Sequence, residues 1–541
     1  MPTKIKKARE ATEHPHPGKP LAGRSTGTGA AFEASAVQVR PQGADLAYDR
    51  PRPSPTRYPI AHDTFVRLKH AALTSKGGTA AKRASTIVHD KPAKAPPAAP
   101  EVAFAGTPLS AAPTTSPPTL LNGFPGISAT GWLPPDCTLA VGPNHVLVSV
   151  NASIAVYPKG GGAAGFTRTL SSWFSNVISS AKIFDPKALY DQHTGRWVLL
   201  TVALGPSAKE SYFLLSVSKT ADPTAGWWNY KLDATKDGGT KTNNWADYPS
   251  LGLDSQALYL TANMFAFGGN FAYAKVRVVP KAGPYSGGAA VFKDLVRIKH
   301  ADGSLAFTVQ PCHTFGAPNV EYLIGSRFPT TSAPETALSL WSLSNPIASP
   351  TLSVKSIAVS PYTLPPDAVQ RGGGTPLDSG DVRMLNAVYR GGSVWCAMTT
   401  AQNYGSSNVA AIHWFQMNPT SGGLTQQGIY GAKDAHYFYP ALMPDSNGNL
   451  IMVFSRSSST EYASARFTGR LAADPLGTLK GSALLKAGIA NYTGLDGSGR
   501  NRWGDYAGVG SDPADSLRVW LYSMYTATSS NWATAIGSAK F

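Results

Sequence analysis

A four-residue motif that occurs twice constrains this chain more than any other sequence feature. Residues 245–248 read Trp-Ala-Asp-Tyr, and residues 503–506 read Trp-Gly-Asp-Tyr. After each copy comes a short stretch with Gly and a second Asp, and then a segment rich in apolar and aromatic residues, which is typical of a β-strand. Such a repeat predicts a fold built from similar units.

Weaker copies of the same unit occur elsewhere, and each reads as a strand, a turn with Asn, Asp or Gly, and a longer strand. The spacings between equivalent positions run from 49 to 68 residues when these positions are Asp136, Asp185, Asp247, His313, Asp381, Phe438 and Asp505. Outer strands repeat as well, and four strands per unit are what a propeller blade requires. We therefore expect an all-β fold, a seven-bladed β-propeller of four-stranded antiparallel blades, with a strand near residues 120–127 completing the last blade. An open β-solenoid is the alternative, but such long and variable units stack poorly.

The N-terminal part of the chain has a different composition. Residues 1–118 are rich in Pro, Ala, Thr, Lys and Arg, and residues 1–100 hold 17 Lys and Arg against 7 Asp and Glu. Such a segment buries too little apolar surface to offset its conformational entropy. The sequence predicts a disordered basic leader and linker over 1–118 and the propeller over 119–541. Few aromatic residues accompany the basic ones, so a nucleic-acid partner is not expected.

Several signals bear on location and on chemistry. No apolar run reaches the length of a transmembrane helix, and no secretory signal follows the basic start. Cys137, Cys312 and Cys396 have no metal-binding spacing, so they are expected as buried free thiols or as one bridged pair with one free thiol. A phosphate-binding loop, a zinc-protease motif and a serine-hydrolase elbow are all missing from the sequence.

A family resemblance rests on four stretches of the sequence. These are Pro-Pro-Asp at 134–136 with Val-Gly-Pro-Asn at 141–144, the two Trp-x-Asp-Tyr motifs, Ser-Arg-Ser-Ser-Ser at 455–459, and Arg-Asn-Arg at 500–502. Together they resemble bacterial sialidase-like (BNR-type) β-propeller proteins over residues 120–541, although no clean Asp box is present. The resemblance implies a propeller and an extracellular or cell-surface location.

In a propeller the starts of the innermost strands meet around the axis, so the repeated positions predict a central pocket. Asp136, Asp185, Asp247, Asp381 and Asp505 would converge there, with His313 nearby. Clustered carboxylates suit glycosidic bond cleavage, and they would also suit Ca²⁺. Alternatively, each Asp caps a turn by accepting backbone N–H groups.

The two motif copies supply the candidate catalytic residues, which are Asp247, Asp505, Tyr248 and Tyr506. Candidate substrate-binding residues are the two tryptophans, the arginines and two further carboxylates: Trp245, Trp503, Arg500, Arg502, Arg383, Arg456, Asp136 and Asp381. The tryptophans would stack on a sugar or pack between blades, and the arginines would clamp a carboxylate or sulfate or pair with the aspartates.

The sequence thus predicts a carbohydrate-active propeller, a glycoside hydrolase or polysaccharide lyase acting on an acidic glycan. The alternative is a non-catalytic module that binds a glycan or a protein. Propellers include both enzymes and binding modules, so the fold alone does not decide between these two functions.

Overall fold

The computed structural model describes residues 30–33, 116–329, 333–405, 407–496 and 499–541. The predicted disordered leader, residues 1–118, lies outside the described residues except for 30–33 and 116–118. Within these ranges the chain is almost entirely β-structure, with one α-helical turn, α3 (Leu170–Trp173), and one 3₁₀ turn, η1 (Pro284–Ser286). No described helix has the length and apolar character that a membrane-spanning helix requires.

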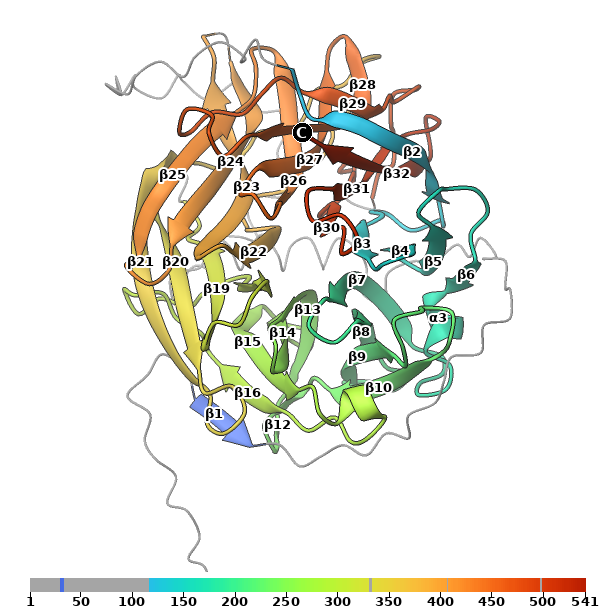
Figure 1. Cartoon of the computed structure of the whole chain (residues 1–541), viewed down its shortest axis with the longest axis vertical. Coiled ribbons are helices and arrows are strands. Elements are labelled where there is room, and N and C mark those ends of the chain that lie inside the picture. The colour runs from blue at the N-terminus through green and yellow to red at the C-terminus, as the bar shows by residue number, and fades with distance from the viewer. Residues whose placement is uncertain (1–29, 34–115, 330–332, 406, 497–498) are drawn as a thin grey trace, which may run out of the picture.

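The sheets stand around a common axis, and the chain passes from one to the next around the ring (Figure 1). Five separate sheets have four strands each. The first two are β3 (Thr138–Val141), β4 (His145–Val150), β5 (Ser153–Pro158), β6 (Phe166–Thr169), and β7 (Lys182–Asp191), β8 (Arg196–Leu204), β9 (Ser211–Ser218), β10 (Trp227–Asp233). The third is β17 (Gln310–Pro311), β19 (Val320–Ser326), β20 (Glu335–Ser344), β21 (Thr351–Tyr362). The fourth is β26 (Ala435–Pro444), β27 (Leu450–Ser458), β28 (Glu461–Arg470), β29 (Ala483–Lys486). The fifth is β30 (Gly508–Ser511), β31 (Val519–Thr526), β32 (Trp532–Lys540), β2 (Thr119–Ser128).

The remaining strands of the ring belong to one ten-stranded sheet. Its first half is β1 (Ala30–Glu33), β16 (Lys293–Val296), β15 (Phe271–Pro280), β14 (Ala257–Ala266), β13 (Asn244–Leu253). After β18 (His313–Thr314) come β22 (Asn386–Arg390), β23 (Ser393–Asn403), β24 (Asn408–Asn418) and β25 (Gly423–Tyr430). A two-stranded sheet, β11 (Lys236–Asp237) with β12 (Thr240–Lys241), stands apart.

The predicted seven separate four-stranded blades are therefore wrong. The propeller has five separate four-stranded blades, and its other strands are continuous in the ten-stranded sheet. The cause is β18, a two-residue strand that pairs in parallel with Leu253 of β13 and with Val388 and Tyr389 of β22. The backbone N–H and C=O groups of β18 thus pair with β13 on one side and with β22 on the other, and this joins two groups of strands into one sheet. The spacing of the repeated residues in the sequence does not indicate a strand of only two residues.

The ring is closed by strands from opposite ends of the described chain. Strand β2 pairs antiparallel with β32, from Thr119 opposite Lys540 to Ser128 opposite Ala533. The predicted strand near residues 120–127 is thus confirmed, and in Figure 1 it lies beside the C-terminus. The pairing covers one edge of β32, and β2 becomes the outer edge strand of this sheet.

Three innermost strands, β7, β13 and β26, contain a left-handed residue directly before a proline in their first half. Asp185, Tyr248 and Tyr439 have φ angles of 54°, 51° and 52°, and each precedes a proline. In each strand the pairing register shifts at this point, which is the signature of a β-bulge. A non-glycine residue at positive φ costs roughly 1–2 kcal/mol, so the surrounding contacts must hold it in place.

Side chains from the preceding sheet supply some of these contacts. Asn151, directly after β4, accepts the backbone N–H of Asp185 at 2.8 Å, and Thr399 of β23 accepts that of Tyr439 at 3.2 Å. Asn151 also donates to the Asp136 carboxylate at 2.7 Å. Neighbouring sheets are therefore locked together at the axis by polar contacts as well as by packing.

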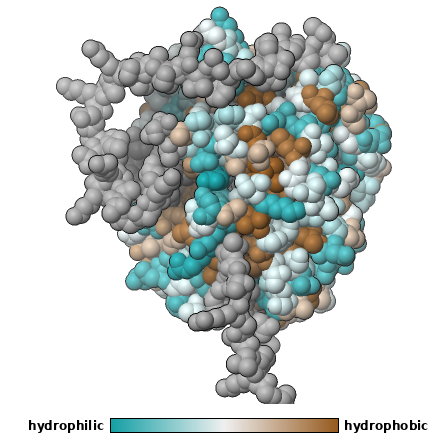
Figure 2. All heavy atoms as spheres, turned by 90° about the vertical axis from the view of Figure 1, so that its left-hand side faces the viewer, coloured by the Kyte–Doolittle hydropathy of each residue, from teal (hydrophilic) through white to brown (hydrophobic). Residues whose placement is uncertain are grey.

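Burial falls from the axis to the periphery. Nine of the ten residues of the innermost strand β13 are buried, whereas only three of the twelve residues of the outermost strand β21 are. Figure 2 views this outer side and shows small hydrophobic patches scattered among hydrophilic residues. The core consists of apolar and aromatic clusters between sheets, as expected where two-sided sheets pack face to face.

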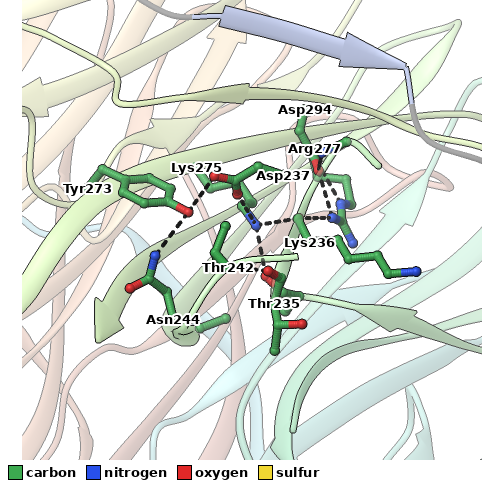
Figure 3. A network of polar contacts seen from close by, with 12 residues as sticks. Thr235, Lys236, Asp237, Thr242, Asn244, Tyr273, Lys275, Arg277 and Asp294 are labelled. Carbon is green, nitrogen blue, oxygen red and sulfur yellow. Dashed lines mark hydrogen bonds and ion pairs between the residues drawn. The ribbon is translucent and has the colours of Figure 1, made fainter. Parts of the chain in front are cut away.

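A buried polar network fixes the loop that carries β11 and β12 (Figure 3). Arg277 of β15 makes a two-point ion pair with Asp294 of β16, with both contacts at 2.7 Å and both side chains fully buried. Next to it, Lys275 pairs with Asp237 at 2.8 Å and donates to the carbonyls of Ala234 and Lys236. Tyr273 donates to Asp237 at 2.6 Å. The network ties the loop to the sheet, because each buried charge needs a partner.

The three cysteines are buried free thiols, as expected. Burial raises the pKa of each thiol, so all three are protonated at neutral pH.

Candidate functional site

Charged and aromatic side chains meet at the axis, at the end where the innermost strands begin. We call this group the axial cluster and define it by these residues: Asp136, Asp185, Lys187, Tyr248, Asp381, Arg383, Arg502, Asp505 and Tyr506. The left-handed backbone at Asp136, Asp185 and Tyr248 holds three of them at the starts of their strands. The connection between β21 and β22, residues 363–385, supplies Asp381 and Arg383.

Lys187 lies at the centre of this cluster. Its Nζ is 3.0 Å from the centre of the Tyr506 ring and 5.5 Å from the centre of the Tyr248 ring. Burial lowers the pKa of Lys187 to about 7, although Asp136, Asp185 and Asp505 act in the opposite direction. An amine with this pKa is partly neutral at physiological pH, which is the condition for a general base or a nucleophile.

Arg383 and Asp381 form a second element of the cluster. The Asp381 carboxylate accepts hydrogen bonds from Nε of Arg383 at 2.7 Å and from its Nη2. The Arg383 guanidinium lies 4.2 Å from the centre of the Tyr248 ring. Burial opposes the charge of Arg383, yet Asp381 outweighs this effect and raises the pKa of the guanidinium above its ordinary value.

A third element is formed by Arg502, Arg500 and their carboxylates. Arg502 bonds to Asp378 through Nη1 and to Asp505 through Nη2 at 3.0 Å, and Arg500 lies 3.4 Å from Asp378. Burial would raise the pKa of Asp378, but the two arginines outweigh it and hold this pKa below its ordinary value. The arginines thus pair with aspartates, which was one of the two roles expected for them.

The tyrosines of the cluster are neutral hydrogen-bond donors. Tyr506 donates to the Pro186 carbonyl at 3.0 Å, and Tyr248 donates to the Asp505 carbonyl at 3.4 Å. The two rings meet edge to face at 5.9 Å. Burial raises the pKa of both phenols well above the ordinary value. They can donate a proton or a hydrogen bond, but they are not bases at neutral pH.

Three of the predicted site residues, Trp245, Trp503 and Asp247, lie in the packed interior outside the axial cluster. Trp245 packs against Phe265 at 5.6 Å between ring centres, and Trp503 packs against Tyr492 at 5.1 Å while its Nε1 donates to Ser455. Both indoles are at most 1 % exposed. This burial favours the packing role of the tryptophans over stacking on a sugar. Asp247 is fully buried in β13, whereas the Asp505 side chain is 12 % exposed.

The strand register corrects the predicted set of equivalent positions. Tyr248, rather than Asp247, matches Asp185, since each lies two residues before the position at which pairing resumes. By the same rule Tyr439 replaces Phe438. His313 belongs to β18 at the opposite end of the axis, where its ring is 2.8 Å from Gln192. Side chains alternate between the two faces of a strand. A shift of the alignment by one residue therefore replaces a side chain that points to the axis by one that points into the sheet packing.

The carboxylates do not form a cation site. Within the described ranges, no group of three or more His, Cys, Asp and Glu side chains is arranged to hold a metal ion. Arginines and Lys187 stand between the aspartates and supply the positive charge themselves. The donor set therefore does not fit the Ca²⁺ ion that the sequence suggested.

An open groove lies apart from the axial cluster, over the strands β26, β27 and β28. Its volume is about 770 Å³. We call it the β26–β28 groove, and its lining includes Arg371, Lys433, Tyr437, Arg456, Glu461, Tyr462 and Arg466. Arg456 is therefore separated from the other predicted arginines.

Glu461 organises the charged part of this groove. One carboxylate oxygen accepts from Arg456 at 2.6 Å and the other from Arg466 at 2.8 Å. The guanidinium of Arg371 lies 5.0 Å from the centre of the Tyr462 ring, and the backbone N–H of Arg371 donates to the backbone carbonyl of Glu461 at 3.2 Å. One carboxylate thus positions two arginines beside aromatic surface. The 363–385 connection contributes to both sites, with Arg371 here and Arg383 at the axis.

Sequence reasoning missed Lys187 and Arg371. Lys187 stands two residues after the repeated Asp185, and the alternation of side chains would have placed both on the same side of the strand. Arg371 precedes Gly372, Gly373 and Gly374, which have the positive φ angles expected of turn glycines. No signal in the sequence indicates that this turn reaches Glu461.

No protein-family model matches the sequence, and no curated protein matches it. Solved structures match at low identity. A protein of unknown function from Dyadobacter fermentans is 11% identical, with 66% of this chain and 94% of that chain covered and a TM-score of 0.40. An α-L-arabinofuranosidase from Fusarium graminearum is 9% identical, with 64% and 89% covered and a TM-score of 0.37. A Trypanosoma rangeli sialidase is 9% identical, with 74% and 59% covered and a TM-score of 0.36. We draw no argument about function from likenesses this distant.

Proposed function

We propose that this chain is a carbohydrate-active propeller that binds an acidic glycan in the β26–β28 groove. The observation that carries this proposal is the convergence of Arg371, Lys433, Arg456 and Arg466 with Tyr437 and Tyr462 in one open groove. Its volume of about 770 Å³ lies in the range of ligand-binding clefts.

The balance of charge in the groove favours an anionic sugar chain. Four basic side chains line it against two acidic ones, Asp434 and Glu461. Arginine binds carboxylate and sulfate groups with two parallel hydrogen bonds. The tyrosine rings offer apolar faces, and the hydroxyls of Ser458, Ser459 and Thr460 supply donors and acceptors for sugar hydroxyls.

Binding of defined oligosaccharides to the full chain tests the proposal. We expect uronate-containing or sulfated oligosaccharides to bind more tightly than neutral ones of equal length, with an affinity that falls as salt rises. The variant Arg456→Met should weaken binding by about tenfold, as expected for loss of one charge-assisted contact. Arg327→Met is the matched control, since Arg327 makes its ion pairs with Asp302 and Glu335 outside the groove. Equal affinity for neutral and acidic oligosaccharides would contradict the proposal.

A second candidate function is catalysis at the axial cluster, and Lys187 favours it. Its pKa of about 7 suits the base of a polysaccharide lyase, and Tyr248 or Tyr506 could donate a proton to the leaving oxygen. In that reaction the base removes the C5 proton next to the uronate carboxylate and the C4–O bond breaks. The departing sugar oxygen takes a proton, and a C4=C5 double bond remains on the uronate. Asp505, the more exposed of the two predicted catalytic aspartates, would instead serve a hydrolase.

Product analysis separates these activities. A lyase gives an unsaturated product that absorbs in the ultraviolet, and a hydrolase gives a reducing end without that absorbance. We expect Lys187→Met to abolish a lyase activity and Asp505→Asn to abolish a hydrolase activity. Turnover unchanged in both variants would exclude the axial cluster as a catalytic site.

A further inference from the structure

A second cavity opens at the opposite end of the axis, where the innermost strands end. Its volume is about 270 Å³, and residues from β3, β7, β18, β22 and β30 line it. A smaller cavity of about 60 Å³, which reaches Lys187, shares Leu139, Leu189, His313 and Val509 with it. The far cavity therefore lies on the axis, but it belongs to the other face of the ring.

Arg390, the last residue of β22, provides the positive charge of this cavity. Its Nη1 donates to the Pro444 carbonyl at 3.0 Å and to the Ser511 hydroxyl at 3.1 Å. Its guanidinium lies 4.6 Å from the centre of the Phe315 ring. These contacts fix the orientation of the guanidinium, and they use only one of its nitrogens as a donor.

No carboxylate within the described part of the chain forms an ion pair with Arg390. Two acidic residues of this region, Asp512 in the lining and Asp445, are already engaged. Asp512 pairs with Lys159 and accepts from Trp520 at 2.9 Å, and Asp445 accepts the backbone N–H groups of Asn447 and Asn449. Burial lowers the pKa of Arg390, and Asp445 offsets only part of this effect. Asp512 also lines the cavity, but its charge is neutralised by the ion pair with Lys159. Since arginine stays protonated in proteins, Arg390 keeps a positive charge that a ligand can neutralise.

The neighbouring side chains set the polarity of the cavity. Ser511 accepts from Arg390, so its own hydroxyl proton remains available for a ligand. Burial lowers the pKa of His313 to about 3, so this ring is neutral, and Gln192 lies 2.8 Å from its Nε2. The remaining lining is largely apolar, with Leu139, Val141, Leu189 and Val509. One oriented cation and one hydroxyl in an apolar cavity form a specific polar anchor.

We propose that Arg390 and Ser511 hold a small oxyanion, the carboxylate or phosphate group of a ligand, in this cavity. The guanidinium binds the oxyanion through the nitrogens that do not contact Pro444 and Ser511, and the Ser511 hydroxyl donates a further hydrogen bond. None of the residues that line the far cavity belongs to the β26–β28 groove or to the axial cluster.

Anion binding to the full chain tests the site, with inorganic phosphate and acetate as probes and equal ionic strength kept with sodium chloride. We expect at least one probe to bind saturably by calorimetry and to raise the thermal midpoint of unfolding. Binding of phosphate but not acetate would identify the ligand group as a phosphate, and binding of acetate but not phosphate would identify it as a carboxylate. Arg390→Met should weaken binding at least tenfold, and Ser511→Ala should weaken it by a smaller factor.

Matched variants make the result specific. Arg327→Met removes an arginine outside the far cavity, the groove and the axial cluster, and it should bind the probe as the unaltered chain does. Since the far cavity shares no lining residue with the groove, failure of the proposed glycan function would leave this inference intact. If Arg390→Met fails to fold, Arg390→Lys takes its place and should bind with reduced affinity. Absence of saturable binding, or equal binding by the Arg390 and Ser511 variants, would overturn the proposal.

Discussion

The ammonium group of Lys187 lies 3.0 Å from the centre of the Tyr506 ring, so residues 319 positions apart in the chain meet at the axis of the propeller. The ring face attracts the cation, whereas burial disfavours the charged form. Burial is the larger effect, since the pKa of Lys187 falls to about 7. The axial cluster thus holds an amine whose charge responds to pH in the physiological range.

The first prediction concerns the pH dependence of stability. The folded-state pKa of Lys187 lies below the ordinary lysine value, so between these two values the unfolded chain binds more protons. The contribution of Lys187 to the free energy of unfolding therefore becomes more favourable as pH rises above about 7. Compared with Lys187→Met, the unaltered chain should gain up to about 1.4 kcal/mol per pH unit in this window. Urea unfolding at pH 7.5 and pH 9 measures it, and an equal difference between the two chains at both pH values would refute it.

The second prediction concerns the buried ion pair of Arg277 and Asp294. Arg277→Met leaves the Asp294 carboxylate buried without its main partner, so the free energy of unfolding should fall by roughly 3–5 kcal/mol. The double variant Arg277→Met, Asp294→Leu should recover part of this loss, because no lone charge remains. Chemical denaturation of the three chains gives the values. A double variant less stable than Arg277→Met alone would contradict the explanation.

Asn151 supports the third prediction. Its amide donates to Asp136 and accepts from the Asp185 backbone, so it connects the first two sheets at the axis. Asn151→Ala should lower the free energy of unfolding by about 1–3 kcal/mol, because the Asp136 carboxylate, the Pro134 carbonyl and the Asp185 N–H each lose a partner. The variant should also shift the titration of Lys187, which both aspartates influence. Asn122→Ala, in the outer strand β2, should cost less.

The fourth prediction follows from the two arginines that Glu461 holds. Glu461→Gln removes the negative charge that competes with a ligand, so we expect tighter binding of an acidic oligosaccharide in the β26–β28 groove, by a few-fold. Calorimetry at two salt concentrations measures the change. Weaker binding would indicate that Glu461 acts chiefly by orienting Arg456 and Arg466.

The fifth prediction uses the cysteines as probes of integrity. Cys137, Cys312 and Cys396 are completely buried, and only a thiolate reacts at a useful rate. The folded protein should therefore resist alkylation at pH 8, and all three thiols should react once denaturant unfolds the chain. Mass spectrometry of the labelled protein counts them, and rapid labelling of a native thiol would contradict the packing described above.

Much of the architecture could be predicted from the sequence. Alternating apolar residues and turn residues indicated the strands, and the recurrence of Asp-containing units indicated a ring of sheets. The strand near residues 120–127, which closes the ring by pairing with β32, was also predicted. These features depend on local pattern, since a hairpin is specified by its own residues.

The site was foreseen only in part. Asp136, Asp185, Asp381 and Asp505 meet at the axis, as their places in the repeat suggested, and Arg383 and Arg502 lie beside them. Asp247, the fifth predicted aspartate, is buried in β13 outside this cluster. Trp245 and Trp503 instead fill the core, and Arg456 lies in a separate groove. Aromatic and charged residues occur together both in binding surfaces and in buried networks. Their presence in the sequence therefore does not tell which of the two they form.

The sequence by itself determined that this chain forms hairpins and repeats them around a ring, because strand periodicity and turn chemistry are local properties. Only the tertiary structure decided which side chains meet. A two-residue strand, β18, merges two parts of the ring into one sheet, and a β-bulge moves Tyr248 to the axis in place of Asp247. Such outcomes depend on register between distant segments, and a shift of one residue exchanges the two faces of a strand.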